Sequence, residues 1–182
     1  LNFVLATNDG YIKQLALADI QPTRTYKSRA MIAMKLKQDT SRVIHVEGVV
    51  PDTKKEITLF TNQAYAVRYD ISEIPTSGAR AAGVKSVNLK DDDYVVDYVT
   101  VDPKYLNLMK LGIITQRGAF KEFKYELINK VSRAKRGVLV LRELKKNPHR
   151  ISGVALFGQN HELIIETSSA RTMTIKTNDF PL

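Results

Sequence analysis

The sequence predicts an all-β protein built as a propeller-like arc of four-stranded blades, with about 3.4 blades in its 182 residues. Three observations lead to this fold class. A phrase made of an apolar run, a turn and a second alternating run returns every 52 to 54 residues. Runs rich in β-branched residues alternate with period two between turn signals, which favours strands. A four-stranded unit of this length cannot bury both faces of its sheet until a neighbouring unit stacks beside it.

The repeated phrase predicts the first hairpin of each unit. Its four copies are FVLATNDGYIK at 3–13, ITLFTNQAYAVR at 57–68, GIITQRGAFK at 112–121 and LIIETSSARTMTIK at 163–176. The threonines within them are separated by 54, 54 and 52 residues: Thr7, Thr61, Thr115 and Thr167. We therefore divide the chain into blade repeats at 1–54, 55–108 and 109–162 and a truncated fourth repeat at 163–182.

Later parts of the unit also recur. Basic residues precede a strand-like run at 28–36, 78–89 and 132–144, and further apolar runs at 42–50 and 94–101 complete the first two units. Residues 121–146 are the best helical candidate because they are rich in Lys, Glu and Leu. They align, however, with strand-like segments of the first two units, and we predict strands there because the repeat is the stronger signal.

The formal net charge of +9 is distributed unevenly along the chain. The third unit holds 12 basic and 4 acidic residues, whereas the second holds 6 and 8. Such a block is a candidate footprint for a polyanion, because each neutralised phosphate releases condensed counterions. The alternative is a solvated charged face.

Glycines lie near the basic turns, where a missing side chain would let phosphate reach backbone N–H groups: Gly78, Gly83, Gly118 and Gly137.

Basic residues recur at the turn before the later strands, so stacking of the units would set them along one rim. We predict phosphate contacts from this rim rather than a uniform circular track, with the third unit and the matching turn of the first contributing most. The predicted contact residues are Lys27, Arg29, Arg80, Lys85, Arg117, Lys121, Arg133, Lys135 and Arg136.

Other kinds of site find little support. The chain has no cysteine and three scattered histidines (His45, His149 and His161), so we predict no metal site. Residues 78–86, GARAAGVKS, nearly match a phosphate-binding loop, but Val84 displaces the lysine and a strand-like run follows. Asp91, Asp92 and Asp93 are predicted to form a solvated turn, because no glycine and glutamate follow them at the spacing of a calcium-binding loop.

Catalysis within the chain also finds no candidate residues. Six tyrosines recur at strand positions, where core packing is the expected role: Tyr11, Tyr65, Tyr69, Tyr94, Tyr98 and Tyr125. No nucleophile, base and orienting group can be nominated together. We expect no cofactor and no small-molecule substrate. The chain lacks an initiator Met, a signal peptide and an apolar run of the roughly 20 residues that span a bilayer, and we interpret it as a piece of a larger cytosolic protein.

The residues also resemble a known family. The unit of an apolar run, T-x-x-G, an apolar residue and K, followed by a basic turn, is similar to the C-terminal β-pinwheel of type IIA bacterial topoisomerase A subunits. ISEIPTSGARAAGVKSVNLKDDDYVV at 71–96 and the segment at 113–151, which begins IITQRGAFKEF, are most similar to the topoisomerase IV branch of Gram-positive type. The resemblance covers nearly all of the chain.

This resemblance implies a propeller-like β-pinwheel whose strands are exchanged between blades and whose basic outer rim binds and bends duplex DNA without sequence specificity. It implies that the catalytic tyrosine, ATP and Mg²⁺ lie elsewhere in a parent isomerase of two A and two B subunits. That enzyme would decatenate DNA and relax supercoils. The implied location is the cytoplasm at the nucleoid, with a peripheral position at the inner face of the membrane as a further expectation.

The gyrase branch of the family carries a QRRGGRG-like heptapeptide that permits full DNA wrapping. Here Gln116-Arg117-Gly118 lies in the wrong turn, and the run from Arg133 to Gly137 lacks the glycine pair. The resemblance therefore favours topoisomerase IV. The alternatives are a gyrase-type DNA-wrapping domain and a propeller-like scaffold that binds an acidic protein.

Overall fold

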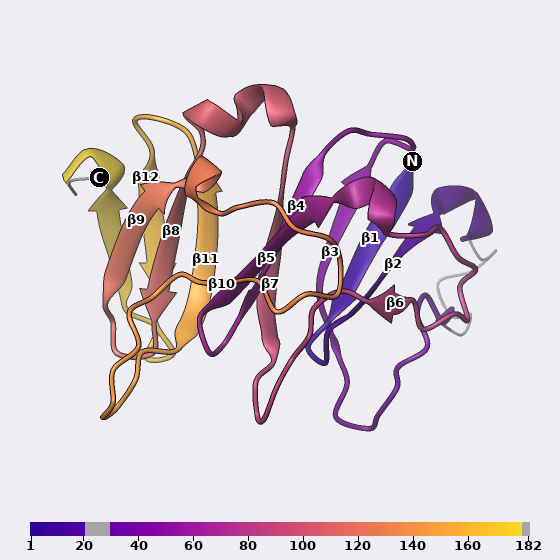
Figure 1. Cartoon of the computed structure of the whole chain (residues 1–182), viewed down its shortest axis with the longest axis horizontal. Coiled ribbons are helices and arrows are strands. Elements are labelled where there is room, and N and C mark those ends of the chain that lie inside the picture. The colour runs from indigo at the N-terminus through magenta and orange to yellow at the C-terminus, as the bar shows by residue number, and fades with distance from the viewer. Residues whose placement is uncertain (21–29, 180–182) are drawn as a thin grey trace.

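The computed structural model describes residues 1–20 and 30–179, apart from the side chain of Asn178. Its sheets stand side by side along an arc, with the first sheet at the right of Figure 1 and the last at the left. The predicted all-β, propeller-like fold class is confirmed. Helical residues in the described ranges form only short 3-10 turns: η1 Leu17–Asp19, η2 Ile71–Glu73, η3 Pro103–Leu108, η4 Tyr125–Leu127 and η5 Thr177–Asp179.

Each sheet is built on the hairpin that the repeated phrase predicted. The first hairpin is β1 (Asn2–Thr7) and β2 (Tyr11–Ala16), with β3 (Val43–Val49) beside β1. The same antiparallel arrangement recurs in the next two blades. Its strands there are β4 (Glu56–Thr61), β5 (Tyr65–Asp70) and β7 (Val95–Val101), then β8 (Lys110–Thr115), β9 (Phe120–Lys124) and β11 (Ile151–Phe157). The fourth sheet holds β12 (Glu162–Glu166) and β13 (Thr172–Lys176).

The first two sheets take their fourth strand from the following repeat. The short strand β6 (Val84–Lys85) pairs with β2, and β10 (Val138–Leu139) pairs with β5. The sheet orders are thus β3-β1-β2-β6 and β10-β5-β4-β7. Because the first two blades are each completed by the next repeat, a break in β6 or β10 affects two blades.

The threonine of the repeated phrase closes the hairpin turn. The Thr7 Oγ1 atom accepts a hydrogen bond from the Tyr11 amide at 3.1 Å, and the Thr7 carbonyl accepts one from Gly10 at 3.0 Å. The other three threonines repeat both bonds. The turn needs a positive φ at its fourth residue, which is 83° at Gly10 and 69° at Ala64. This requirement explains why a small residue follows each threonine at a spacing of three.

The inner edge of the arc is formed by β3, β7 and β11, which contact one another in succession. His45 of β3 and Asp97 of β7 join the first two blades, with 2.5 Å between Nδ1 and Oδ1. The Tyr98 hydroxyl donates to the Val4 carbonyl oxygen at 2.8 Å. Since β6 and β10 lie at the opposite edges of their sheets, they mark the outer rim.

Two local expectations have different outcomes. Residues 121–146 contain β9, η4 and β10, so the prediction of strands over a helix is confirmed. The described part of the strand-like run at 28–36, residues 30–36, forms no strand. Its counterparts β6 and β10 each add to the hairpin of the preceding repeat, and the described residues contain no hairpin before β1. Within those residues, no helix has the length and apolar character to cross a membrane.

Candidate nucleic-acid interface

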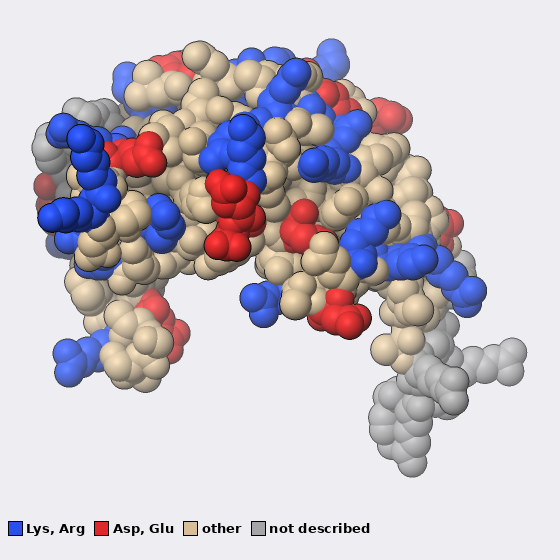
Figure 2. Space-filling view, turned by 60° about the horizontal axis from the view of Figure 1, so that its bottom comes forward, with Lys and Arg blue, Asp and Glu red and all other residues tan. Residues whose placement is uncertain are grey.

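Three rim segments follow one another along the outer rim, one from each complete repeat: residues 30–36, 78–90 and 130–146. The Lys35 amide donates to the Ala81 carbonyl at 3.2 Å, which joins the first segment to the second. The Asn88 amide donates to the Lys135 carbonyl at 2.9 Å, which joins the second to the third. These backbone hydrogen bonds join the three segments into one continuous surface along the outer rim. Figure 2 shows Lys and Arg side chains in several separate groups over one face of the arc, with acidic groups between them.

The described predicted contacts fall into two groups by exposure. Five are exposed: Arg80, Lys85, Arg117, Lys121 and Lys135. Arg133 and Arg136 are half-buried. The other two, Lys27 and Arg29, lie outside the described residues. The segments at 78–90 and 130–146 cross the outer rim and bring Arg80, Lys85 and Lys135 onto it, and Arg117 and Lys121 extend the basic surface over the third hairpin.

Arg133 and Arg136 are held by the protein itself. The Arg133 Nε atom donates to the Glu73 carbonyl at 3.0 Å, and its Nη1 atom donates to the Lys85 carbonyl. The Arg136 guanidinium stacks over the Tyr65 ring with 4.0 Å to the centroid. These contacts give both arginines a positioning role on the rim, in addition to the phosphate contact that the sequence predicts.

Gly83 and Gly137 face a neighbouring strand and not the phosphate that the sequence suggested. A Cβ atom on Gly137 would overlap the carbonyl oxygen of Ala66, and one on Gly83 would overlap that of Ile12. Their missing side chains therefore let the exchanged segment approach the neighbouring strand rather than a phosphate. A Cβ atom on Gly78 or Gly118 would meet no atom within 4 Å, but the Gly118 amide already donates to the Thr115 carbonyl at 2.9 Å.

A buried lysine that sequence reasoning missed anchors the rim. Lys13 is fully buried, and its Nζ atom donates to the carbonyls of Gly78, Ala79 and Ala81 at 2.6, 3.3 and 3.3 Å. Burial lowers its pKa because the charged form loses hydration. Its counterpart two repeats later, Lys121, donates to the Val140 carbonyl at 2.9 Å. A lysine three residues after the hairpin turn was the available signal.

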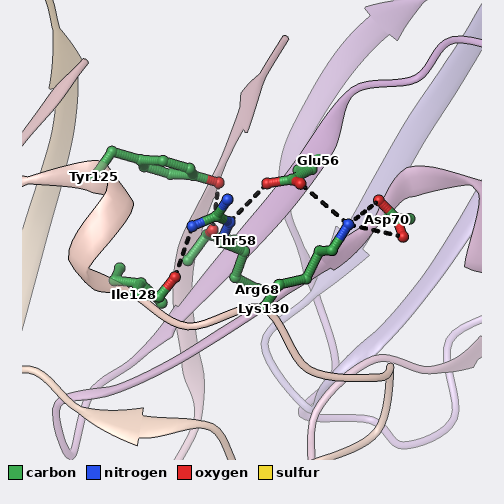
Figure 3. A network of polar contacts seen from close by, with 7 residues as sticks. All are labelled: Glu56, Thr58, Arg68, Asp70, Tyr125, Ile128 and Lys130. Carbon is green, nitrogen blue, oxygen red and sulfur yellow. Dashed lines mark hydrogen bonds and ion pairs between the residues drawn. The ribbon is translucent and has the colours of Figure 1, made fainter. Parts of the chain in front are cut away.

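A charged network connects the second and third blades where the chain enters the rim (Figure 3). Arg68 of β5 pairs with Glu56 of β4, with 2.6 Å between Nε and Oε2, and donates from Nη1 to the Ile128 carbonyl at 2.7 Å. Lys130 reaches Glu56 and Asp70 at 3.3 and 3.0 Å. Ile128 and Lys130 immediately precede the third rim segment, so the network sets its position.

Tyr125 completes this network from the third repeat. Its hydroxyl lies 2.6 Å from Thr58 Oγ1, and its ring lies 5.0 Å from the Arg68 guanidinium carbon. Burial raises the pKa of Tyr125 to about 12. Tyr69, Tyr98 and Tyr125 are fully buried, as expected for core packing, whereas Tyr94 is exposed.

The first joint uses neutral side chains at the same positions. Gln14 Nε2 donates to the Ile74 carbonyl at 2.9 Å, and Asn2 Nδ2 donates to Gln14 Oε1 at 3.1 Å. Asn2 and Gln14 precede Glu56 and Arg68 by 54 residues each. The two joints thus share a geometry and differ in charge.

The residues set aside as metal or catalytic candidates have ordinary partners. Asp93 Oδ1 accepts the amides of Gln63 and Tyr94, as in a capped turn. His149 contacts Thr115 Oγ1, and His161 contacts the Gln159 carbonyl. Among residues 1–20 and 30–179, no group of three or more His, Cys, Asp or Glu side chains is placed to hold a metal ion.

The chain was also compared with known proteins. The family model of the DNA gyrase C-terminal domain, a beta-propeller, matches residues 2–49 and 55–101. The DNA topoisomerase 4 A-type subunit of Streptococcus pyogenes is 38% identical over 149 residues, which is 82% of this chain and 17% of the relative. The chain therefore spans less than a fifth of the length of that relative.

Two solved structures share the arrangement. The crystal structure of the C-terminal domain of DNA topoisomerase IV matches with a TM-score of 0.85 and 35% identity, over 99% of this chain and 53% of that one. The DNA gyrase A C-terminal domain matches with a TM-score of 0.81 and 18% identity, over 97% and 56%. At that lower identity the gyrase likeness shows the shared fold alone.

Proposed function

This chain belongs to the DNA gyrase C-terminal domain family, and from that membership we propose that it binds duplex DNA along its outer rim without sequence specificity. The DNA would bend around the arc and be positioned for the catalytic core of topoisomerase IV. The observation that carries this proposal is the continuous outer rim with exposed Arg80, Lys85 and Lys135. Such side chains contact phosphates, which are the same in every DNA sequence.

The same proposal covers the parent enzyme. Two A subunits, each ending in a domain of this kind, would assemble with two B subunits of topoisomerase IV, in the cytoplasm at the nucleoid. DNA cleavage by a tyrosine and the use of ATP and Mg²⁺ would take place outside this chain. Decatenation and supercoil relaxation would then depend on the chain only through the DNA that it holds.

A salt titration tests the DNA proposal. About five phosphate contacts would make affinity for duplex DNA fall roughly 10²- to 10³-fold between 50 and 200 mM salt, because bound cations release counterions. Gel-shift titrations on several unrelated duplexes should give the same slope. DNA binding that barely changes with salt, or a preference for an acidic protein over DNA, would contradict the proposal.

Neutralising the exposed rim locates the binding surface. Changing Arg80, Lys85 and Lys135 to glutamine should weaken binding to all duplexes and reduce the salt slope by about one for each contact. The control changes Lys54 and Lys104 to glutamine. Lys54 lies in the loop before β4, and Lys104 lies in η3. Both are at the end of the blades opposite the hairpin turns. If the control lowers the slope and the rim variant does not, DNA binds another face.

A further inference from the structure

A small hollow at the joint of the second and third blades is lined by three arginines. Its volume is about 180 Å³. Arg136 comes from the rim segment beside β10, and Arg142 and Arg150 come from the chain that leads to β11. Tyr65 and His149 complete this side of the wall. We call this site the arginine hollow.

The cations of the arginine hollow have no carboxylate partner. Within residues 1–20 and 30–179, no carboxylate lies within ion-pair distance of Arg136, Arg142 or Arg150. Asp91 and Glu143 line the same hollow but form no ion pair with them. Three guanidinium groups against two carboxylates leave the lining of the hollow with a net positive formal charge, which favours an anion.

Two of the three arginines are already held in place. Arg136 stacks on the Tyr65 ring at 4.0 Å. The Arg150 amide donates to Gln116 Oε1 at 2.6 Å, and its Nη1 atom donates to the His149 carbonyl at 3.2 Å. Arg142 is exposed and has no hydrogen bond to another described residue. Planar guanidinium groups fixed in this way match the oxygens of a phosphate.

The other described joint lacks these charges. The amides of Asn62 and Gln116 donate to the carbonyls of Tyr94 and Arg150, which makes Tyr94 the counterpart of Arg150. The 54-residue spacing makes Ala82 and Asn88 the counterparts of Arg136 and Arg142. None of the three counterparts is cationic. Of these two joints, only the one between the second and third blades carries the arrangement.

We propose that the arginine hollow clamps one phosphate group of the DNA backbone and thereby fixes where the duplex crosses the arc. This inference rests on the proposed DNA-binding function. The clamp would concentrate contact at one joint, while the exposed rim lysines contribute diffuse attraction. Its ligand is a phosphodiester, which the planar guanidinium groups would bind through directed hydrogen bonds as well as through their charge.

The test compares arginine-to-lysine with arginine-to-alanine changes in the 182-residue chain. Arg142→Ala with Arg150→Ala should weaken duplex binding at least tenfold and reduce the salt slope by about one, because charge-assisted hydrogen bonds to phosphate are lost. Arg142→Lys with Arg150→Lys preserves net charge and should still lose several-fold, because lysine cannot form the bidentate pair. Full affinity in the lysine variant would overturn the clamp.

A matched control removes one exposed charge elsewhere. Arg171 lies in the turn between β12 and β13, and only its backbone forms hydrogen bonds in the described structure. Arg171→Ala should change binding less than Arg142→Ala alone. Equal losses in these two variants would refute the clamp while leaving DNA binding intact. A wild-type chain that binds no duplex at low salt would instead refute the proposed function itself.

Inorganic phosphate distinguishes a DNA phosphate from a free one. At constant ionic strength, added phosphate should compete with DNA on the wild-type chain more strongly than on the double alanine variant. Duplex DNA should shift the arginine Nε–Hε NMR signals that disappear in that variant. If inorganic phosphate shifts those signals and duplex DNA does not, the hollow binds free phosphate and the assignment to DNA is wrong.

Discussion

Replacing Gly137 by alanine should destabilise the chain by about 4 kcal/mol, which is a large part of the stability of a typical domain. The added Cβ would overlap the Ala66 carbonyl oxygen, an atom of the β5 backbone that cannot move without disturbing the second sheet. The residue also has a φ of 83°, which is strained for a residue with a side chain. Urea unfolding monitored by circular dichroism measures the loss.

Gly118→Ala is the matched control for this change. Gly118 has a similar φ of 73°, but a Cβ there would have no atom within 4 Å. It should therefore cost only the backbone strain, about 1 kcal/mol. Equal losses at Gly118 and Gly137 would show that close approach of the exchanged segment to β5 is not what the glycine provides.

Removing the Glu56 carboxylate should cost about 3 to 5 kcal/mol, because it leaves a buried cation without its partner. The Arg68 side chain is only 9% exposed and that of Glu56 5%, so water cannot replace the pair. Lys130 would also lose one of its two carboxylates. Thermal unfolding of Glu56→Ala measures the effect. Asn2→Ala at the neutral first joint should cost only about 1 kcal/mol.

A transplant of the first joint into the second separates charge from geometry. Glu56→Asn combined with Arg68→Gln reproduces the pair formed by Asn2 and Gln14. A neutral hydrogen-bonded pair should recover much of the stability that Glu56→Ala loses, because no unpaired charge remains. If the transplant is as unstable as Glu56→Ala, the joint depends on packing around Arg68 and not on its charge balance.

Much of the fold could be predicted from local signals. The threonine at each hairpin turn acts over four residues, through its hydroxyl and carbonyl bonds to the residues that follow. Its spacing therefore revealed the repeat directly. The same spacing correctly outweighed the helical composition of residues 121–146, because packing against neighbouring blades overrides propensity.

The interface was less accessible to sequence reasoning. Charge counting indicated the third repeat as the basic one, and the phosphate contacts assigned to individual residues there remain predictions. Local sequence could not show that Arg133 holds the carbonyls of Glu73 and Lys85, which lie 60 and 48 residues away. Nor could it distinguish the buried Lys13 from a surface lysine. Such pairings depend on which segments come together when the blades stack.

The sequence by itself determined the repeat, the hairpins and the uneven charge, because each follows from residue types within one unit. The tertiary structure decided which strands are exchanged: β6 and β10 belong to the sheets of the preceding repeats, and Gly83 and Gly137 face a neighbouring strand. It also decided which cations remain available for phosphate. The physical reason is that an exchanged strand gains its hydrogen bonds from a distant hairpin, so its partner is set by the stacking of blades and not by its own residues.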